Sequence, residues 1–186
     1  MNVRKTKLAG VVVLEPDVFS DERGYFLETW NSKRYLDVSI EDCFVQDNIS
    51  FSKKGVLRGL HYQYPQSQAK LVQVLSGEVV DVAVDIRKDS PTFGQWISEV
   101  LSEANHRQMY IPSGFAHGYC VINETALFSY KCTDFYNPAS EGGIIWNDPD
   151  IKIVWPTEEP MLSDKDSSFP KLSDIPPEKL PQLESL

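Results

Sequence analysis

The sequence predicts an all-β fold, a sandwich or barrel of short strands that ends in an irregular tail. Short apolar or alternating runs recur at regular spacing with turn residues between them, a pattern that favours a sandwich or barrel over alternating strands and helices. Before the tail, only Asn31 stands where a helix would begin. After residue 137, closely spaced prolines forbid long regular elements.

The expected elements follow one another along the chain. A short apolar strand is expected at residues 11–14, a turn at 20–24 and an aromatic-rich strand at 25–30. Asn31 is expected to cap a short helix that ends near residue 37. Further strands are expected at residues 44–51, 70–75, 79–86, 94–101, 108–111, 118–122 and 126–133.

The stretch from residue 58 to residue 85 contains the strongest candidates for a site. Arg58, His61 and Gln63 are polar groups at its start, and Lys70 opens the first of two strands. A turn is expected at residues 76–78. In the second strand Val80, Val82, Val84 and Ile86 share one face, whereas Asp81, Ala83 and Asp85 share the other. A base and a cation are therefore expected on a rigid β-scaffold.

Length and charge limit the possible functions. A chain of 186 residues is expected to form a single domain over residues 1–186, with a tail from about residue 148 that wraps around the strands. A net charge of −9 argues against nucleic acid as a partner, although a few basic side chains in one pocket could still bind a small anion.

Compartment and membrane association follow from other features. No apolar run approaches the roughly 20 residues that a membrane span needs, so no membrane partner is expected. The N-terminal residues lack the apolar core and cleavage site of a signal peptide. Cys43, Cys120 and Cys132 are scattered and odd in number, which predicts free thiols in a reducing cytoplasm.

Two short segments resemble the sequence motifs of cupins, which are small jelly-roll β-barrels. Residues 110–117, YIPSGFAH, contain PxGxxH, and residues 59–63, GLHYQ, lie where the other motif would. A metal-binding cupin usually offers HxH and a following carboxylate there, but this chain has Gln63 in place of the second histidine.

The histidines that remain make a poor metal site. His61 and His117 are left from the expected set, and His106 is expected in a surface loop. Two imidazoles without a well-placed carboxylate do not suit zinc or iron. The expectation is a metal-free barrel that uses no cofactor.

A pocket with histidine, lysine, tyrosine and arginine suits proton abstraction beside a carbonyl, because histidine can take the proton and a cation can stabilise the enolate. Each residue also has an ordinary structural interpretation. His61 could be a hydrogen-bonded structural residue, Lys70 a solvated edge charge, and Asp166 part of a surface charge run. Tyr130 and Tyr136 could be ordinary strand aromatics. From these residues alone the reaction stays open.

Over residues 11–166 the chain resembles the dTDP-4-dehydrorhamnose 3,5-epimerases, a family of metal-free cupins. Long segments in the same order carry the resemblance: DERGYFLETW, FVQDNISFSKKGVLRGLHYQ, QAKLVQVLSGEVVDVAVDIRKDSPTFGQW, IPSGFAHGY, YKCTDFYNP, WNDPDI and LSDKD. Ile49 and Phe51 are more apolar than expected beside QDN.

The resemblance implies a reaction and a set of roles. The family epimerises dTDP-4-dehydro-6-deoxy-D-glucose at carbons 3 and 5. His61 would be the general base and Asp166 its partner. Tyr130 would be the acid on the opposite face of the sugar, and Lys70 the cation beside the keto oxygen. The substrate-binding positions would be Arg23, Phe26, Glu28, Gln46, Asp47, Asn48, Arg58, His117, Tyr136, Glu141 and Lys165.

The resemblance also implies a homodimer in which the N-terminal strand region crosses to the partner, so that Arg23 and Glu28 would complete the neighbour's site. Three alternatives stay open. They are an epimerase that inverts a single carbon of a related dTDP-sugar, a non-catalytic jelly roll that binds nucleotide sugars, and a metal-dependent cupin oxygenase or isomerase.

Overall fold

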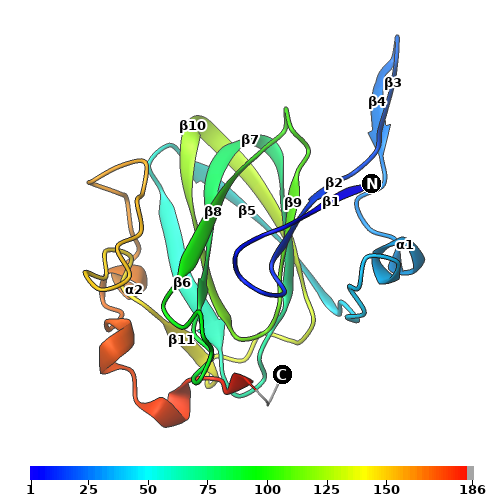
Figure 1. Cartoon of the computed structure of the whole chain (residues 1–186). Coiled ribbons are helices and arrows are strands. Elements are labelled where there is room, and N and C mark those ends of the chain that lie inside the picture. The colour runs from blue at the N-terminus through cyan, green and yellow to red at the C-terminus, as the bar shows by residue number, and fades with distance from the viewer. Residues whose placement is uncertain (184–186) are drawn as a thin grey trace.

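Two long antiparallel strands, β7 (Lys70–Asp85) and β10 (Phe115–Cys132), organise the fold in this computed structural model, which describes residues 1–183 (Figure 1). They lie at the centre of a nine-stranded sheet with the order β1-β2-β9-β7-β10-β6-β11, in which β5 also pairs with β10 and β8 with β7. The strands curl around a common interior, which confirms the predicted all-β jelly-roll barrel.

The other strands of this sheet are short. Their bounds are β1 (Asn2–Lys5), β2 (Val12–Glu15), β5 (Gln46–Lys53), β6 (Leu57–Gln63), β8 (Trp96–Ser102), β9 (Gln108–Ile111) and β11 (Glu141–Gly143). The strands expected at 11–14, 44–51, 94–101 and 108–111 are thus confirmed within about two residues, which is the usual uncertainty of strand ends.

The turn expected at residues 76–78 is wrong, and so is the division of residues 118–133 into two strands. β7 and β10 continue through this region with two shifts in register, where Val74 pairs with Phe128 but Ser76 pairs with Leu127. Leu75 is therefore an extra residue, a β-bulge, and Gly77 has a φ of 83°. A Ser-Gly-Glu segment suits a bend within a continuous strand as well as a hairpin turn that reverses the chain.

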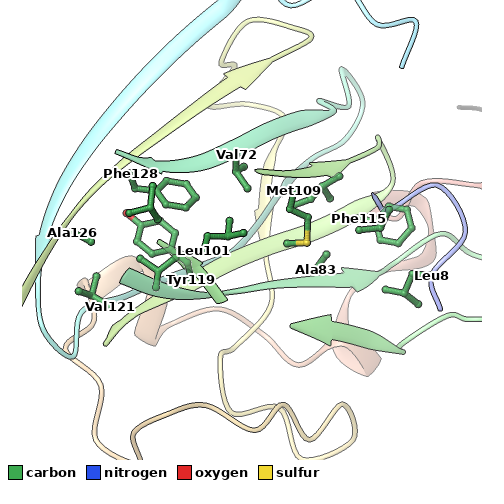
Figure 2. Close-up of a cluster of buried hydrophobic side chains, with 14 residues drawn as sticks. Leu8, Val72, Ala83, Leu101, Met109, Phe115, Tyr119, Val121, Ala126 and Phe128 are labelled. Carbon is green, nitrogen blue, oxygen red and sulfur yellow. The ribbon is translucent and has the colours of Figure 1, made fainter. Parts of the chain in front are cut away.

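The bulge changes which residues of β7 face the interior. Before it, Val72 and Val74 belong to the main hydrophobic core, and after it Val79 and Ala83 do. Figure 2 shows part of this cluster, where residues from both halves of β7 approach Met109 and other buried side chains. The bend therefore lets one strand contribute to two walls of the barrel.

The outer face of the second half of β7 is also buried. Val82, Val84 and Ile86 pack in a second cluster whose other members come largely from the tail: Ile144, Ile151, Leu172, Ile175 and Leu180. The tail contains α2 (Asp164–Ser167) and two 3-10 turns, η1 (Leu172–Asp174) and η2 (Pro177–Lys179). The alternation predicted for the second half of β7 is therefore present, but both faces of the strand are buried, as is common for central strands.

A separate two-stranded hairpin, β3 (Val18–Asp21) and β4 (Gly24–Leu27), projects from the barrel (Figure 1). The strand expected at 25–30 ends at Leu27, and the expected helix is confirmed as α1 (Ser32–Leu36), with Asn31 as its N-cap. Phe19 and Phe26 are 61% and 69% exposed on the hairpin, which is unusual for aromatic side chains. The Tyr25 ring contacts His106 in a tilted arrangement, with ring centroids 4.6 Å apart.

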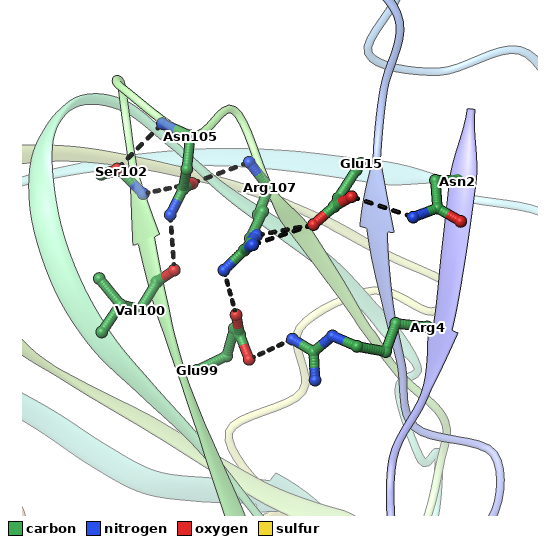
Figure 3. Close-up of polar contacts among 8 residues, drawn as sticks. All are labelled: Asn2, Arg4, Glu15, Glu99, Val100, Ser102, Asn105 and Arg107. Carbon is green, nitrogen blue, oxygen red and sulfur yellow. Dashed lines mark hydrogen bonds and ion pairs between the residues drawn. The ribbon is translucent and has the colours of Figure 1, made fainter.

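A polar network ties the N-terminal strands to the barrel (Figure 3). Arg107 donates to Glu15 at 3.0 Å and to Glu99 at 2.9 Å, and Arg4 donates to Glu99 at 2.6 Å. These contacts join β1 and β2 to β8 and to the start of β9. They are partly exposed, so each contributes about 1 kcal/mol or less.

Two further expectations can be compared with the structure. Cys43, Cys120 and Cys132 are free thiols, as predicted. Within residues 1–183, every helix is too short and too polar to cross a membrane.

The bend at Gly77 can be tested against Gly55, which has a similar φ of 79° but open space around its Cβ position. An added Cβ at Gly77 would lie 2.0 Å from the Thr125 carbonyl oxygen. We expect Gly77→Ala to lower the free energy of unfolding by about 2 kcal/mol more than Gly55→Ala, because only the first adds overpacking to backbone strain. Urea unfolding measures both, and equal losses would contradict this account of the bend.

Candidate active site

A polar cavity of about 220 Å³ opens at one end of the barrel, between the strands β5, β6, β7, β10 and β11. Its lining residues are Gln46, Asn48, His61, Tyr62, Gln63, Gln68, Lys70, Tyr130, Cys132, Tyr136 and Glu141. An adjoining cavity of about 140 Å³ shares three of them, His61, Lys70 and Tyr130. It adds Ser50, Arg58, His117, Tyr119 and Phe128.

His61 and Asp166 form a hydrogen-bonded pair at this site, although they lie 105 residues apart in the sequence. The Nε2 atom of His61 lies 2.5 Å from Oδ1 of Asp166. Asp166 is buried in α2, which Ser163 caps by accepting the Asp166 N–H at 3.1 Å. Burial would raise the pKa of Asp166, but the hydrogen bond and charge of His61 outweigh it and the pKa is lowered.

This arrangement leaves His61 ready to accept a proton. Its bond to a carboxylate uses Nε2, so the free ring nitrogen is Nδ1. The ring of Phe169 meets the imidazole edge-on, with centroids 5.6 Å apart, and further restricts its orientation. A carboxylate behind the ring also stabilises the imidazolium that forms after proton transfer.

Lys70 stands at the start of β7, on the inward face with Val72, and lines both cavities. Burial lowers the pKa of Lys70, while nearby negative groups oppose that effect. The amine therefore holds its proton less tightly than an exposed lysine does, and it lies where a ligand would meet it.

Tyr130 lies on β10, where its Cα partners are Val72 on β7 and Asn48 on β5. Burial raises the pKa of Tyr130 to about 12. Its hydroxyl is thus protonated near neutral pH and can donate a proton.

Arg58 and His117, two predicted substrate-binding residues, line the adjoining cavity. Arg58 Nε donates to Ser52 Oγ at 3.0 Å. His117 is the Cα partner of His61 across β6 and β10, and its Nε2 lies 2.9 Å from the carboxylate of Asp81. The sequence interpretation overlooked Asp81 because it assigned the residue only to a polar strand face.

Four other predicted residues meet at the rim of the larger cavity. Glu141 accepts from Lys165 Nζ at 2.7 Å and from the Tyr136 hydroxyl at 3.0 Å. The Tyr136 backbone N–H donates to Gln46 Oε1 at 2.9 Å. This rim joins α2, and hence Asp166, to the strands that hold the rest of the site.

Four predicted residues lie elsewhere in this chain. Asp47 points outward because it alternates with Gln46 and Asn48 on β5, and it pairs with Lys131 at 2.9 Å. Arg23 and Phe26 are on the projecting hairpin, and Glu28 accepts a hydrogen bond from Asn31 at 3.1 Å. Among the described residues, none of these four lines either cavity.

Several lining residues were not assigned to the site by the sequence interpretation, and strand alternation could have found some of them. Gln63 was named among the polar groups that suit a site, and it lines the larger cavity two residues after His61 on β6. Cys132, predicted only as a free thiol, lies two residues after Tyr130 on β10 and so shares a face with a predicted site residue.

Ser50 lies two residues after Asn48 on β5, and Tyr119 lies two residues after His117 on β10, so the same alternation could have found both. Gln68 gave no comparable signal. Within residues 1–183, no group of three or more His, Cys, Asp or Glu side chains is arranged to hold a metal ion.

The lowered pKa of Asp166 has a consequence for stability. Its ionised form stabilises the fold above the ordinary carboxyl value of 3.8, and this contribution is lost as the pH falls through the lower folded-state value. We expect Asp166→Asn to lower the free energy of unfolding most near neutral pH and least in acid, as measured by urea unfolding at a series of pH values. Asp164→Asn, an exposed change in the same helix, should show no such trend. A cost that is constant with pH would contradict the pairing.

Comparison with known proteins identifies the family. Residues 5–174 match the sequence model of the dTDP-4-dehydrorhamnose 3,5-epimerases. A relative of that name from Shigella flexneri is 54% identical over 176 residues, covering 94% of this chain and 97% of the relative. A 3,5-epimerase from Legionella pneumophila, crystallised in complex with dTDP-4-keto-L-rhamnose, is 52% identical with a TM-score of 0.95, and the match covers 97% of each chain.

A more distant structure shares the same fold. It is a double mutant of a 3′-monoepimerase from Streptomyces bikiniensis in complex with dTDP, 31% identical with a TM-score of 0.91, covering 97% of this chain and 92% of that one. The family match and the high identities over nearly the whole length agree with the resemblance found in the sequence. This chain belongs to the dTDP-4-dehydrorhamnose 3,5-epimerase family.

Proposed function

We propose that this chain inverts carbons 3 and 5 of dTDP-4-dehydro-6-deoxy-D-glucose and releases dTDP-4-dehydro-L-rhamnose. One observation carries the proposal: the His61–Asp166 pair, Tyr130 and Lys70 meet at one cavity. A base, an acid and a cation are the groups that epimerisation beside a ketone requires. The relatives' names and the ligand of the Legionella pneumophila enzyme support the choice of substrate.

The reaction begins with proton loss from a carbon next to the ketone. The 4-keto group acidifies the hydrogens on carbons 3 and 5 alike, so a single base can act on both in succession. His61 Nδ1 takes the proton, and Asp166 stabilises the imidazolium. The electron pair of the broken C–H bond forms a C=C bond to carbon 4, the π pair of the carbonyl moves to the keto oxygen, and Lys70 stabilises the enolate there.

The second half of each inversion returns a proton from the opposite face of the sugar. Tyr130 donates it to the same carbon, and its raised pKa keeps the hydroxyl protonated until then. Before the second carbon reacts, His61 gives up its proton to solvent and Tyr130 regains one from solvent. No electron enters or leaves overall.

The remaining predicted residues bind the substrate. Gln46, Asn48, Arg58 and His117 line the cavities and hold the sugar, and the rim of Tyr136, Glu141 and Lys165 stands where the diphosphate would enter. Binding at the nucleotide end positions the sugar without taking part in the chemistry.

The predicted substrate-binding residues that line neither cavity fit a homodimer in which the N-terminal strand region reaches the partner's site. The β3–β4 hairpin projects from the barrel with Arg23 at its tip and with Phe26 largely exposed. Exposed aromatics on a projecting element mark a contact surface. Arg23, Phe26 and Glu28, together with Asp47, would then bind the nucleotide of the neighbouring subunit. The free thiols fit a reducing cytoplasm, which fractionation of cells would test.

Incubation with dTDP-4-dehydro-6-deoxy-D-glucose in heavy water tests the reaction. We expect deuterium at both carbons 3 and 5, because each loses a proton and regains one from solvent. Deuterium at one carbon would instead identify a single-carbon epimerase, and deuterium at neither would leave only nucleotide-sugar binding. Loss of activity after exhaustive chelation would indicate a metal-dependent cupin.

Two variants separate the roles in the same assay. His61→Asn should abolish deuterium uptake, whereas affinity for dTDP stays within a few-fold, because base and nucleotide anchor are separate. Tyr130→Phe should still remove the proton from the sugar carbon. It should lower the rate of protonation from the opposite face by about a hundredfold. Unchanged product formation by Tyr130→Phe would remove Tyr130 from the acid role.

Mixed dimers test the crossing of the hairpin. Arg23→Glu leaves the pocket intact, and His61→Asn leaves the hairpin intact. If hairpins serve the neighbour's site, random mixing of the two inactive variants should restore about a quarter of wild-type activity, because half the dimers contain one complete site. If each hairpin serves its own site, the mixture stays inactive.

A further inference from the structure

Asp81 is a fully buried carboxylate at a position that the alternation of β7 would otherwise give to an apolar side chain. It lies on the inward face of that strand with Val79 and Ala83, which belong to the main core. Burial of an ionised carboxylate is unfavourable unless donors and opposite charges surround it. The contacts of Asp81 should therefore indicate its role.

Comparison with Asp85, on the same face of β7, distinguishes two kinds of buried carboxylate. Asp85 accepts from Arg87 Nε at 2.9 Å and from Ser90 Oγ at 2.6 Å, and so closes the loop that follows the strand. Both hydrogen bonds that the described residues give the Asp81 carboxylate come from His117 Nε2, at 2.9 and 3.0 Å. His117 lines the active-site cavity, so Asp81 contacts the site rather than a loop.

His117 is held firmly by this contact. Its ring is buried and stacks on Phe128, with centroids 6.1 Å apart and planes 22° from parallel. With Nε2 directed at a carboxylate, the ring has one orientation and one tautomer when neutral. A second His–Asp pair thus lies beside the first, since His117 and His61 are Cα partners.

Lys70 approaches the same cavity from the other half of β7. No residue in the described part of the chain forms a hydrogen bond or an ion pair with its ammonium group. Burial lowers the pKa of Lys70, and three groups oppose this, Cys132, Asp81 and Glu141 in decreasing order. An available anion among them would offset the burial and favour the charged form of Lys70.

Two of these groups are unsuited to that task. Burial raises the pKa of the Cys132 thiol, so it is neutral near pH 7. Glu141 already accepts hydrogen bonds from Lys165 and Tyr136. Asp81 remains.

The other titratable groups around the two cavities do not replace Asp81. The basic ones, Arg58, His61 and His117, disfavour a charged Lys70 when they are protonated. The pKa values of the Tyr62, Tyr130 and Tyr136 phenols are raised above the ordinary value of 10, so these groups are not anions near neutral pH.

We propose that Asp81 is a positioning residue of this active site, whose buried carboxylate orients the His117 ring and keeps the Lys70 ammonium charged beside the keto oxygen. The proposal rests on the function given above, because the charge on Lys70 matters to catalysis only if an enolate forms. Burial raises the pKa of Asp81 above its ordinary value, although His117 and Lys70 favour the ionised form. The proposal requires the carboxyl group to be ionised over the pH range of activity.

The titration of Lys70 in the free protein tests this directly. The full chain is labelled with ¹³C at lysine Cε, and the Lys70 signal is identified by its loss in Lys70→Arg. Asp81→Asn should move the Lys70 titration to lower pH, because the variant removes an opposing negative charge. In the pH profile of kcat, the fall at high pH should move in the same direction. Above the pH at which the wild-type kcat falls, the variant's kcat should be about tenfold or more below wild type.

Two matched variants separate charge from packing. Asp85→Asn removes a buried carboxylate from the same face of the strand and should lower stability, yet it should leave the Lys70 titration and the basic limb unchanged. Asp81→Glu retains the charge and should restore the titration toward wild type. An unshifted Lys70 titration in Asp81→Asn, or an equal shift in Asp85→Asn, would overturn the proposal.

A measurement on the wild type keeps the proposal testable if Asp81→Asn does not fold. The carboxyl ¹³C signal of Asp81 should report an ionised group throughout the pH range of activity. A protonated Asp81 in that range would overturn the proposal. Because the lysine and carboxyl titrations need no turnover, they test Asp81 separately from the epimerase reaction.

Discussion

The antiparallel pairing of β7 with β10 is the constraint on which the rest of the structure depends. Their ladder extends from Lys70 opposite Cys132 to Asp85 opposite Phe115, and both strands bend where Gly77 approaches residues 125 and 126. The bend brings the two halves of each strand to different walls of one barrel. Apolar side chains fill part of the interior, and polar ones converge at the cavities. Core and site therefore share the same register, and a slip by one residue would disrupt both.

Sequence periodicity predicted most of the fold because strands, turns and caps have local causes. The strand at residues 108–111 and the helix capped by Asn31 were predicted at their observed positions. The bend at Gly77 was not, because a Ser-Gly-Glu segment fits a hairpin turn as well as a bulge. The choice depends on the distant partner strand, whose pairing no local pattern reveals. The projecting hairpin was predicted only as a turn and a strand, since its separation from the barrel is a tertiary property.

The candidate site was predicted chiefly through resemblance to a family, and the reason is physical. Asp166 looks like part of a surface charge run, and only the folded tail brings it to His61. Strand alternation gave the faces of β7 correctly but could not show that the polar face was buried, so Asp81 was overlooked. Asp47 was placed in the site by resemblance, whereas alternation along β5 directs it outward. The proposed role of Arg23 in a partner's site lies beyond the reach of any single-chain pattern.

The account requires that the sugar lie between His61 and Tyr130, with its keto oxygen toward Lys70. A crystal structure with a stable dTDP-deoxyhexose that lacks the 4-keto group would test this most directly. We expect carbons 3 and 5 to present one face to His61 Nδ1 at about 3–3.5 Å, with Tyr130 on the opposite face and the oxygen on carbon 4 nearest the Lys70 ammonium. A sugar bound outside the barrel, or one with His61 and Tyr130 on the same face, would contradict the account.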